Sequence, residues 1–365
     1  MGMTCKYLYL PIPTPFPPGF VRIVIYARRL RFSTTHCSTH IQTVPTASAV
    51  LDLHFWPHDG SILSIATSTG TLASYRIHKE SSSEPVIAHV ATLQIAPPST
   101  LNLAFTFHSD RSSNLFASTL STGEVVVGRN LITDDPSERD IEVAVVLNHD
   151  LEAWTAAFDW DGAGIFSGGD DSIFQFISGL NDLVQDSSSS VQSLSLESGP
   201  DPAWRDRRSH SAGVTAILPL SSDLVLTGSY DDHIRLIRTS PRPRVLVEEN
   251  LGGGVWRLKV VRKLLDIAST SAEGLSTNSA FIILASCMHA GARIVRVESK
   301  EGEWSIDVLA KFEEHESMNY GSDIQPLKSD QVGNDEMART VISTSFYDKR
   351  LCMWRWSGVE EQSNA

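Results

Sequence analysis

Several short segments combine a histidine with carboxylates, aromatic rings or glycines, and these residue types can carry chemistry. The segment VLTGSYDDHIRLI (225–237) places Asp231 and Asp232 directly before His233. A carboxylate beside an imidazole is a typical acid–base pair, because histidine gains and loses protons near neutral pH. The same residues also suit a β-turn, since aspartate side chains accept hydrogen bonds from nearby backbone amides. The surrounding sequence has to distinguish an active site from a turn.

Asp231 belongs to a pattern that occurs three times. Each copy ends a strand in small residues, continues with an aspartate and reaches a bulky apolar residue six positions later: FSGGDDSIFQFI (166–177), LTGSYDDHIRLI (226–237) and STSFYDKRLCMW (343–354). An active site normally occurs once, whereas an element of a fold repeats. We therefore predict that Asp171, Asp231 and Asp348 are structural turn residues rather than catalytic ones.

Three further segments keep the same strand–turn–strand shape: LSIATSTGTLASYRI (63–77), LFASTLSTGEVVVGR (115–129) and LASCMHAGARIVRV (284–297). Nearly every such unit follows another apolar segment, so each predicts a small antiparallel sheet of about four strands. Short strands in regular units, with turns between them, are typical of an all-β WD-repeat β-propeller. Six blades are discernible between residues 45 and 356, with a Ser-rich insertion at 178–204 and a C-terminal tail at 357–365.

The N-terminal segment, residues 1–44, lacks the repeat. The first 51 residues contain no Asp or Glu and include the proline-rich run PIPTPFPPG. We expect an irregular segment that supplies at most one strand, which would close the ring of blades. The run VRIVIY is the candidate for that strand. An organellar transit peptide is the alternative, because such peptides are basic and poor in acidic residues.

Composition excludes some partners. The chain of 365 residues has a formal net charge of −13, with 41% hydrophobic and 20% charged residues, which is ordinary for a globular protein. This balance argues against binding to nucleic acid. No apolar run approaches the roughly 20 residues that span a bilayer, so we expect that the membrane is not a partner. The four scattered cysteines suggest neither a zinc site nor disulfides, and we expect a reducing, cytoplasmic location.

The most informative residues are those that the repeat does not require. In ASCMHAGARI, His289 holds the turn position where other units have aspartate, and it is the first candidate for a general acid or base. His233 is the second. The alternative for His289 is an exposed histidine with no catalytic role. The alternative for His233 is a histidine held by a local hydrogen bond. The glycines of NLGGGVWRLK (250–259) allow the backbone to approach a ligand closely or form a tight loop. Cys287 and Ser345 are possible nucleophiles, but both lie in predicted strands and are expected to be buried.

Common catalytic motifs are absent: there is no G-x-S-x-G elbow, no H-E-x-x-H helix and no P-loop. Nevertheless, SGGDDS, LTGSYDDHIR, GGVWRLK, ASCMHAGARI, HESMNYGSD and STSFYDKRLCMW together resemble the eukaryotic WD-repeat diphthine methyl ester hydrolases, most closely the fungal branch. The resemblance runs from about residue 45 to 356 and implies seven blades in the family, of which six are discernible here. Residues 1–44 do not resemble the family's first blade.

This resemblance implies a carboxylic ester hydrolase (diphthine methylesterase) in diphthamide biosynthesis. The implied substrate is diphthine methyl ester on a histidine of translation elongation factor 2, which also carries a trimethylammonium group. Hydrolysis gives diphthine and methanol, and no cofactor or metal is implied. A non-catalytic WD-repeat adaptor in a protein complex is the alternative, since it explains the missing motifs.

Ester hydrolysis requires an activated water or nucleophile, and aromatic faces favour a quaternary ammonium group. His289 and His233 are accordingly the candidate catalytic residues. The candidate substrate-binding residues come from three segments that precede blades, and from one turn: Trp154, Trp256, Arg257, His315, Glu316, Tyr320 and Tyr347.

Overall fold

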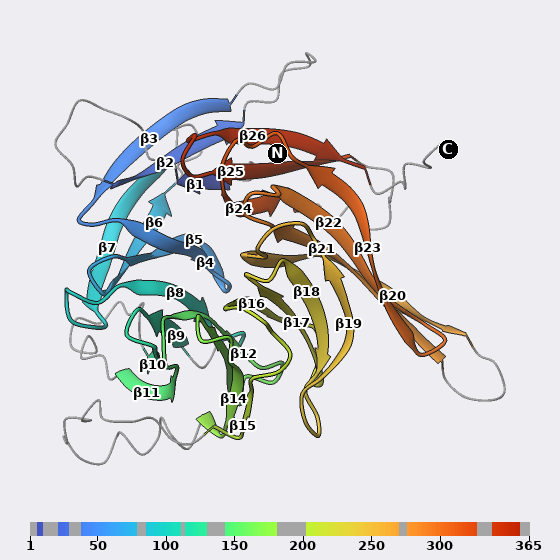
Figure 1. Ribbon diagram of the computed structural model, residues 1–365. Helices are drawn as coiled ribbons and strands as arrows, with labels where there is room; N and C mark the ends of the chain where they lie inside the picture. Colours follow the sequence, from blue (N-terminus) through green and yellow to red (C-terminus); the bar gives the residue numbers. More distant parts are fainter. Residues whose placement is uncertain are drawn as a thin grey trace. The chain divides into compact units, whose positions relative to one another are not determined.

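The structure, a computed structural model, describes residues 6–9, 21–28, 38–78, 85–110, 114–129, 143–180, 202–269, 276–326 and 338–357. The elements that it describes are β-strands, labelled β1 to β26 in Figure 1. Each strand pairs antiparallel with its neighbour in sequence to build small sheets. The chain divides into two compact units, Met1–Arg207 and Arg208–Ala365.

The first unit has four sheets in its described residues. Their strands, sheet by sheet, are β1 (Lys6–Tyr9), β2 (Val21–Arg28) and β3 (Ser38–Thr46); β4 (Val50–Trp56), β5 (Asp59–Thr67), β6 (Thr71–His78) and β7 (Val86–Gln94); β8 (Asn102–Phe107), β9 (Leu115–Leu120), β10 (Glu124–Arg129) and β11 (Val143–Asn148); and β12 (Ala153–Phe158), β13 (Gly164–Gly169), β14 (Phe174–Ser178) and β15 (Trp204–Asp206).

The second unit has three sheets in its described residues. Their strands are β16 (Val214–Pro219), β17 (Leu224–Ser229), β18 (His233–Arg238) and β19 (Arg244–Asn250); β20 (Arg257–Ser269), β21 (Ser276–Ser286), β22 (Ala292–Lys300) and β23 (Glu303–Phe312); and β24 (Asn319–Ile324), β25 (Arg339–Ser345) and β26 (Leu351–Trp356). The six strand–turn–strand units predicted from the repeat all form, as β5–β6, β9–β10, β13–β14, β17–β18, β21–β22 and β25–β26.

The N-terminal region differs from the expectation. We expected at most one strand in residues 1–44, but β1, β2 and β3 form a three-stranded antiparallel sheet of their own, and β2 contains the run VRIVIY. Of the predicted Ser-rich insertion, residues 181–201 lie outside the described part. Its last residue, Trp204, begins β15, so the insertion separates the third and fourth strands of one sheet.

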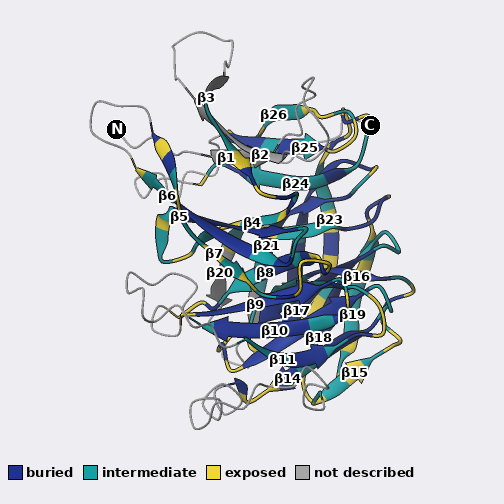
Figure 2. Cartoon of the chain, turned by 90° about the vertical axis from the view of Figure 1, so that its left-hand side faces the viewer, coloured by how far each residue is buried: buried dark blue, intermediate teal, exposed yellow. Residues whose placement is uncertain are grey.

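In the four-stranded sheets, burial is greatest in the middle strands (Figure 2). All six residues of β9, β13 and β17 are buried, whereas the last strands β7 and β19 are partly exposed. In the second unit, aliphatic side chains of the β16–β19 and β20–β23 sheets pack together, among them Leu226, Leu236 and Ile283. Burying such a side chain stabilises the fold by about 1.5–3 kcal/mol. These packed faces fix the turns that carry the polar residues.

Candidate active site

His289 lies at the tip of the hairpin between β21 and β22. Ala285 pairs with Arg293, which makes His289 the middle residue of the turn, just as the pairing of Gly228 with Ile234 makes Asp231 the middle residue of its turn. The side chain of His289 is exposed. Among the described residues, none holds its imidazole by a hydrogen bond. The histidine is therefore available to a ligand in a way that Asp231 is not.

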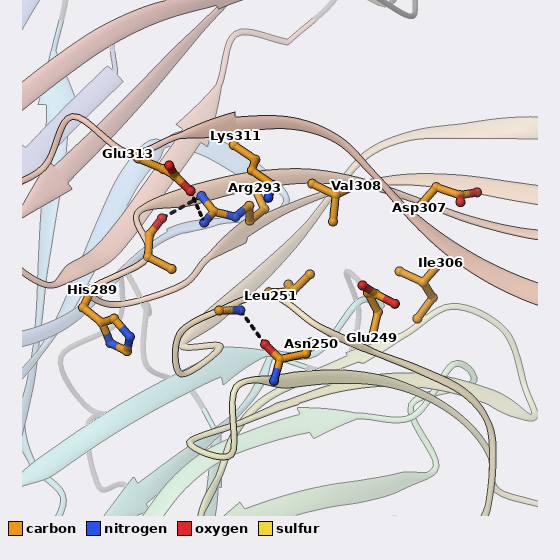
Figure 3. A pocket seen from close by; sticks show the side chains of 12 residues that line it. Glu249, Asn250, Leu251, His289, Arg293, Ile306, Asp307, Val308, Lys311 and Glu313 are labelled. Carbon is orange, nitrogen blue, oxygen red and sulfur yellow. Dashed lines mark hydrogen bonds and ion pairs between the residues drawn. The ribbon is translucent and has the colours of Figure 1, made fainter. Parts of the chain in front are cut away.

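An open hollow begins beside His289 (Figure 3). It has a volume of about 870 Å³. It lies between the outer strands β19 and β23 and the two loops next to them. Its lining mixes acidic, basic and apolar side chains: Glu249, Asn250, Leu251, His289, Arg293, Ile306, Asp307, Val308, Lys311 and Glu313, together with Gly252 and Ala290. Arg293 is buried and donates to Glu313 at 2.6 Å, so this pair forms one wall.

The glycine loop packs directly on the hairpin that carries His289. A side chain at Gly253 would place its Cβ 2.4 Å from the carbonyl oxygen of Cys287 and 2.8 Å from the Cβ of Ala290. A Cβ at Gly254 would lie 2.6 Å from the sulfur of Met288. The sequence left two alternatives for these glycines, a close approach to a ligand and a tight loop. In the structure, the backbone of this loop closely approaches the β21–β22 hairpin of the protein itself.

Aromatic residues of the second unit form a continuous cluster next to this hairpin. The ring of Trp256 lies 5.0 Å from that of Tyr320 and 5.8 Å from that of Tyr230, between centroids. Phe346 lies 5.9 Å from Tyr320, and Tyr347 lies 5.0 Å from Phe346. Tyr347 is 70% exposed and Phe346 43% exposed. The structure therefore brings together three predicted residues, Trp256, Tyr320 and Tyr347.

Tyr230 and Phe346 were missed by the sequence analysis. Tyr230 directly precedes Asp231 in SYDD, where the β13–β14 hairpin has Asp170, and Phe346 precedes Asp348 by two residues in SFYD. Aromatic residues just before the turn aspartate of both hairpins, unexplained by the core, were the signal that could have identified them.

The backbone joins the aromatic cluster to the histidine hairpin. Met288 and Asn319 exchange two hydrogen bonds, with N···O distances of 3.2 and 2.9 Å. Met288 precedes His289 in the chain, and Asn319 precedes Tyr320. The side chain of Asn319 is fully buried and donates to the carbonyl oxygens of Gly321 and Thr344. The segments that carry His289 and Tyr320 are consequently connected through the backbone.

Arg257 adds a cation to the cluster. Its guanidinium carbon lies 5.3 Å from the centroid of the Trp256 ring, and its Nη1 donates to the carbonyl oxygen of Trp256 at 3.1 Å. A guanidinium over an aromatic face is an attractive cation–π arrangement. Arg257 was predicted as a substrate-binding residue, and the structure places it beside Trp256.

The three turn aspartates accept hydrogen bonds from their own surroundings. Asp231 accepts from the N–H of Ser211 and of His233, and from the side chain of Arg235 at 2.9 Å. Burial alone would raise the pKa of Asp231, but the Arg235 side chain and the Ser211 amide lower it to about 2. Asp171 and Asp348 likewise accept from the amides of Asp150 and Glu316. These contacts support the structural role that the repeat predicts.

Three buried histidines complete the same repeated unit. His149, His210 and His315 each place Nε2 2.8–2.9 Å from a strand hydroxyl, that of Ser167, Thr227 and Ser343 respectively. His149 also bonds Asp171 at 2.9 Å through Nδ1. Serine, histidine and aspartate are therefore connected here as in a hydrolytic triad. Yet Ser167 and the side chain of His149 are fully buried, so no substrate reaches them.

His315 and Glu316 fit substrate binding less well than predicted. His315 is only 7% exposed and bonds to Ser343, so it occupies the position of His149 and His210 in the repeated unit. Burial lowers its pKa below the ordinary value. Glu316 is exposed and forms an ion pair with Arg350 at 2.9 Å. The position of His315 in the repeated unit accounts for its burial, and its role in substrate binding stays a prediction.

His233 and Trp154 each have a hydrogen-bond partner of their own. Nδ1 of His233 lies 2.6 Å from the carbonyl oxygen of Asp231, which is the local hydrogen bond that the sequence offered as the alternative. Trp154 belongs to the first unit, where its Nε1 donates to Asp170 at 3.0 Å.

The alternative nucleophiles are inaccessible. Cys287, which directly follows β21, is fully buried, and Ser345, the last residue of β25, is 3% exposed, so both are buried as expected. Burial raises the pKa of the Cys287 thiol to about 12, so the thiolate that would attack is not formed at neutral pH. Among the described residues, no group of three or more His, Cys, Asp or Glu side chains is placed to hold a metal ion.

Comparisons with known proteins place the chain in a family. It is 31% identical, over 84% of its length and 78% of the relative's, to a protein of Schizosaccharomyces pombe named diphthine methyltransferase. The chain belongs to the diphthine methyltransferase family. A homologue from Dictyostelium discoideum is 26% identical over 86% of the chain and 78% of its own length. The searched family models give no match.

The fold class is confirmed by a solved structure. The WD40 β-propeller domain of Doa1 superimposes with a TM-score of 0.54, covering 92% of this chain and 89% of that one at 11% identity. The likeness shows the fold alone. In the part of the chain that the structure describes, no helix is long and apolar enough to span a membrane.

Proposed function

We propose that this protein hydrolyses the methyl ester of diphthine methyl ester on translation elongation factor 2, giving diphthine and methanol in the cytoplasm. The observation that carries the proposal is family membership: the relatives are named for the methyl chemistry of diphthine. Such a name indicates an enzyme that acts on diphthine, and hydrolysis is our more specific assignment. Its support in the structure is the exposed imidazole of His289 beside an open hollow.

His289 acts as the general base in this proposal. One ring nitrogen accepts a proton from water as the water oxygen forms a bond to the ester carbonyl carbon. The tetrahedral intermediate then breaks its bond to the methoxy oxygen, which takes the proton back from the imidazolium and leaves as methanol. The carboxylic acid that remains loses its proton to solvent. No buried side chain has to move, because His289 already lies at the tip of its hairpin.

The aromatic cluster supplies the contacts to the substrate. Trp256, Tyr320 and Tyr347 present ring faces and edges next to the His289 hairpin, and such rings attract quaternary ammonium groups. The hollow between β19 and β23 is open enough to receive part of a protein substrate. Glu316 lies near this surface on the loop before β24 and is retained as a contact of the protein substrate.

The test uses the purified full chain and elongation factor 2 that carries the methyl ester, without an added methyl donor. Methanol release, with loss of one methyl group from the substrate by mass spectrometry, is the expected result. A methyl group gained only when S-adenosylmethionine is supplied would make the protein a transferase and overturn the proposal. A stable complex without turnover would instead identify an adaptor.

His289→Ala and His78→Ala provide the matched pair. His78 is also an exposed histidine, at the end of β6 in the first unit. The His289 variant should lose methanol release while the His78 variant retains it. Equal activity in both would remove His289 from the mechanism.

A further inference from the structure

The cation of Arg257 and the aromatic cluster lie next to each other, and this combination recognises more than a positive charge. Aromatic rings attract a quaternary ammonium, whereas a guanidinium repels it and attracts a carboxylate. Arg257 lies 5.3 Å from the Trp256 ring, and Trp256 lies 5.0 Å from Tyr320. A ligand that carries both charged groups on one carbon atom can therefore engage both groups at once.

We propose that Trp256, Tyr320 and Arg257 form a site for an α-trimethylammonio carboxylate, with the ammonium on the rings and the carboxylate on Arg257. The choice of ligand rests on the proposed function, since diphthine carries these two groups together. The exposed rings of Phe346 and Tyr347 extend the aromatic surface toward solvent. Arg257 is held in place by its bond to the carbonyl oxygen of Trp256, so it is already positioned before a ligand arrives.

Arg257 distinguishes the ester from the tetrahedral intermediate and the product, because these states differ in charge. The ester is neutral at its carbonyl oxygen, but the oxygen becomes negative in the tetrahedral intermediate and stays negative in the product carboxylate. Arg257 consequently binds the intermediate and the product better than the ester. A group that binds the transition state better than the substrate raises kcat rather than lowering KM. The aromatic rings bind the trimethylammonium equally in all states, so they act on KM.

Binding of small molecules to the intact protein tests the site without any turnover. The probes are glycine betaine, tetramethylammonium, which lacks the carboxylate, and 3,3-dimethylbutanoate, which lacks the positive charge. Titration calorimetry should show glycine betaine binding at least tenfold tighter than either of the others, roughly the factor expected when one charged contact is lost. Equal binding of glycine betaine and 3,3-dimethylbutanoate, or no binding of glycine betaine, overturns the proposal.

Two variants assign the contacts. Arg257→Gln should lose the preference for glycine betaine over tetramethylammonium, while tetramethylammonium binds as well as before or better. Trp256→Leu should weaken both ligands, and Trp256→Phe, which keeps a ring, should weaken them less. Arg244→Gln, at an exposed arginine that begins β19, is the control and should leave the preference unchanged. An unchanged preference in Arg257→Gln contradicts the role of Arg257 even if that variant folds normally.

The kinetic signature distinguishes this inference from the proposed function. If methanol is released, Arg257→Gln should lower kcat on the order of 10²-fold with little change in KM, whereas Trp256→Leu should mainly raise KM. The reverse pattern contradicts the division of roles. If no methanol is released but the three probes bind in the predicted order, the proposed hydrolysis fails and the binding site stands.

Discussion

His289 differs from the turn aspartates because nothing in the described part of the fold depends on its side chain. We therefore expect His289→Asp, which introduces the residue found at the turn of three other hairpins, to unfold within about 0.5 kcal/mol of the parent. Its methanol release should fall on the order of 10²- to 10⁴-fold, the usual loss for a general base. Thermal unfolding and turnover are measured on the same preparation. Parental turnover would show that the imidazole has no role in the reaction.

Asp231 should govern the acid stability of the second unit. Its folded pKa of about 2 lies below the ordinary value of 3.8, so the folded state favours the ionised carboxylate. The stabilisation, about 2 kcal/mol, is therefore fully present above pH 5 and is lost as the pH falls from about 4 toward 2.

Asp231→Asn should remove this stabilisation at neutral pH and flatten the pH dependence of unfolding in that range. Asp150→Asn, at a side chain that is 71% exposed, is the matched control and should do neither. Denaturant unfolding between pH 2 and pH 7 measures both variants. A steep acid transition that persists in Asp231→Asn contradicts the assignment.

At the scale of elements, the glycine loop and the β21–β22 hairpin behave as one piece. Gly253→Ala would force its new Cβ into the carbonyl oxygen of Cys287, so the hairpin or the loop has to shift. We expect a loss of about 1–3 kcal/mol in unfolding free energy and a fall in turnover, because His289 moves with its hairpin. Gly60→Ala is the control, since nothing lies within 4 Å of its added Cβ. Unchanged turnover in Gly253→Ala would show that the position of the hairpin does not matter.

The β24–β26 sheet should weaken in mild acid. Burial lowers the pKa of His315 below 6.5, so the unfolded state binds the proton more readily than the folded state. Stability contributed by His315 is then present above pH 6.5 and is lost as the pH falls toward the lowered folded value. Amide hydrogen exchange of β25 at pH 7.5 and pH 5.5 measures this, corrected for intrinsic rates. His315→Gln should abolish the difference in exchange between the two pH values. If the difference persists, another titrating group causes it.

The sequence predicts the repeated hairpins well because alternation and turn residues are local signals. It predicts Asp231 for the same reason: the turn and the residues that bond it are close along the chain. The aromatic cluster was only partly predicted, because Tyr230, Trp256 and Tyr320 come from three separate sheets and meet through packing. The burial of His315 could not be predicted, because a buried histidine bonded to Ser343 has the same sequence appearance as an exposed one.

At the scale of the whole molecule, the repeated histidine–hydroxyl unit occurs in both compact units. His149 lies in Met1–Arg207 and His315 in Arg208–Ala365. Removing either buried histidine leaves a strand hydroxyl without its partner, which should cost about 1–3 kcal/mol. Hydrogen exchange followed by mass spectrometry should therefore show the first loss of protection in the altered unit: around β13 for His149→Ala and around β25 for His315→Ala. Simultaneous loss in both units would mean that the chain opens as a single cooperative structure.

The three-stranded sheet of β1–β3 shows where a whole-chain prediction fails. A repeat is predicted because its sequence is similar to the other repeats of the chain. The N-terminal segment resembles none of them. The run VRIVIY identified one strand, but the pairing partners Lys6–Tyr9 and Ser38–Thr46 lack comparable apolar alternation. Such strands form because they pair with a neighbouring strand, and not because their own sequence alternates between apolar and polar residues.

The buried connection of Ser167, His149 and Asp171 bears on how this activity would be detected. Fluorophosphonate probes, which label the reactive serine of many hydrolases, need an accessible hydroxyl, and Ser167 is fully covered. With a water molecule as the attacking group, no serine would become acylated either. A proteome-wide survey with such probes would pass over this protein, and a template search for triads would select the wrong three residues.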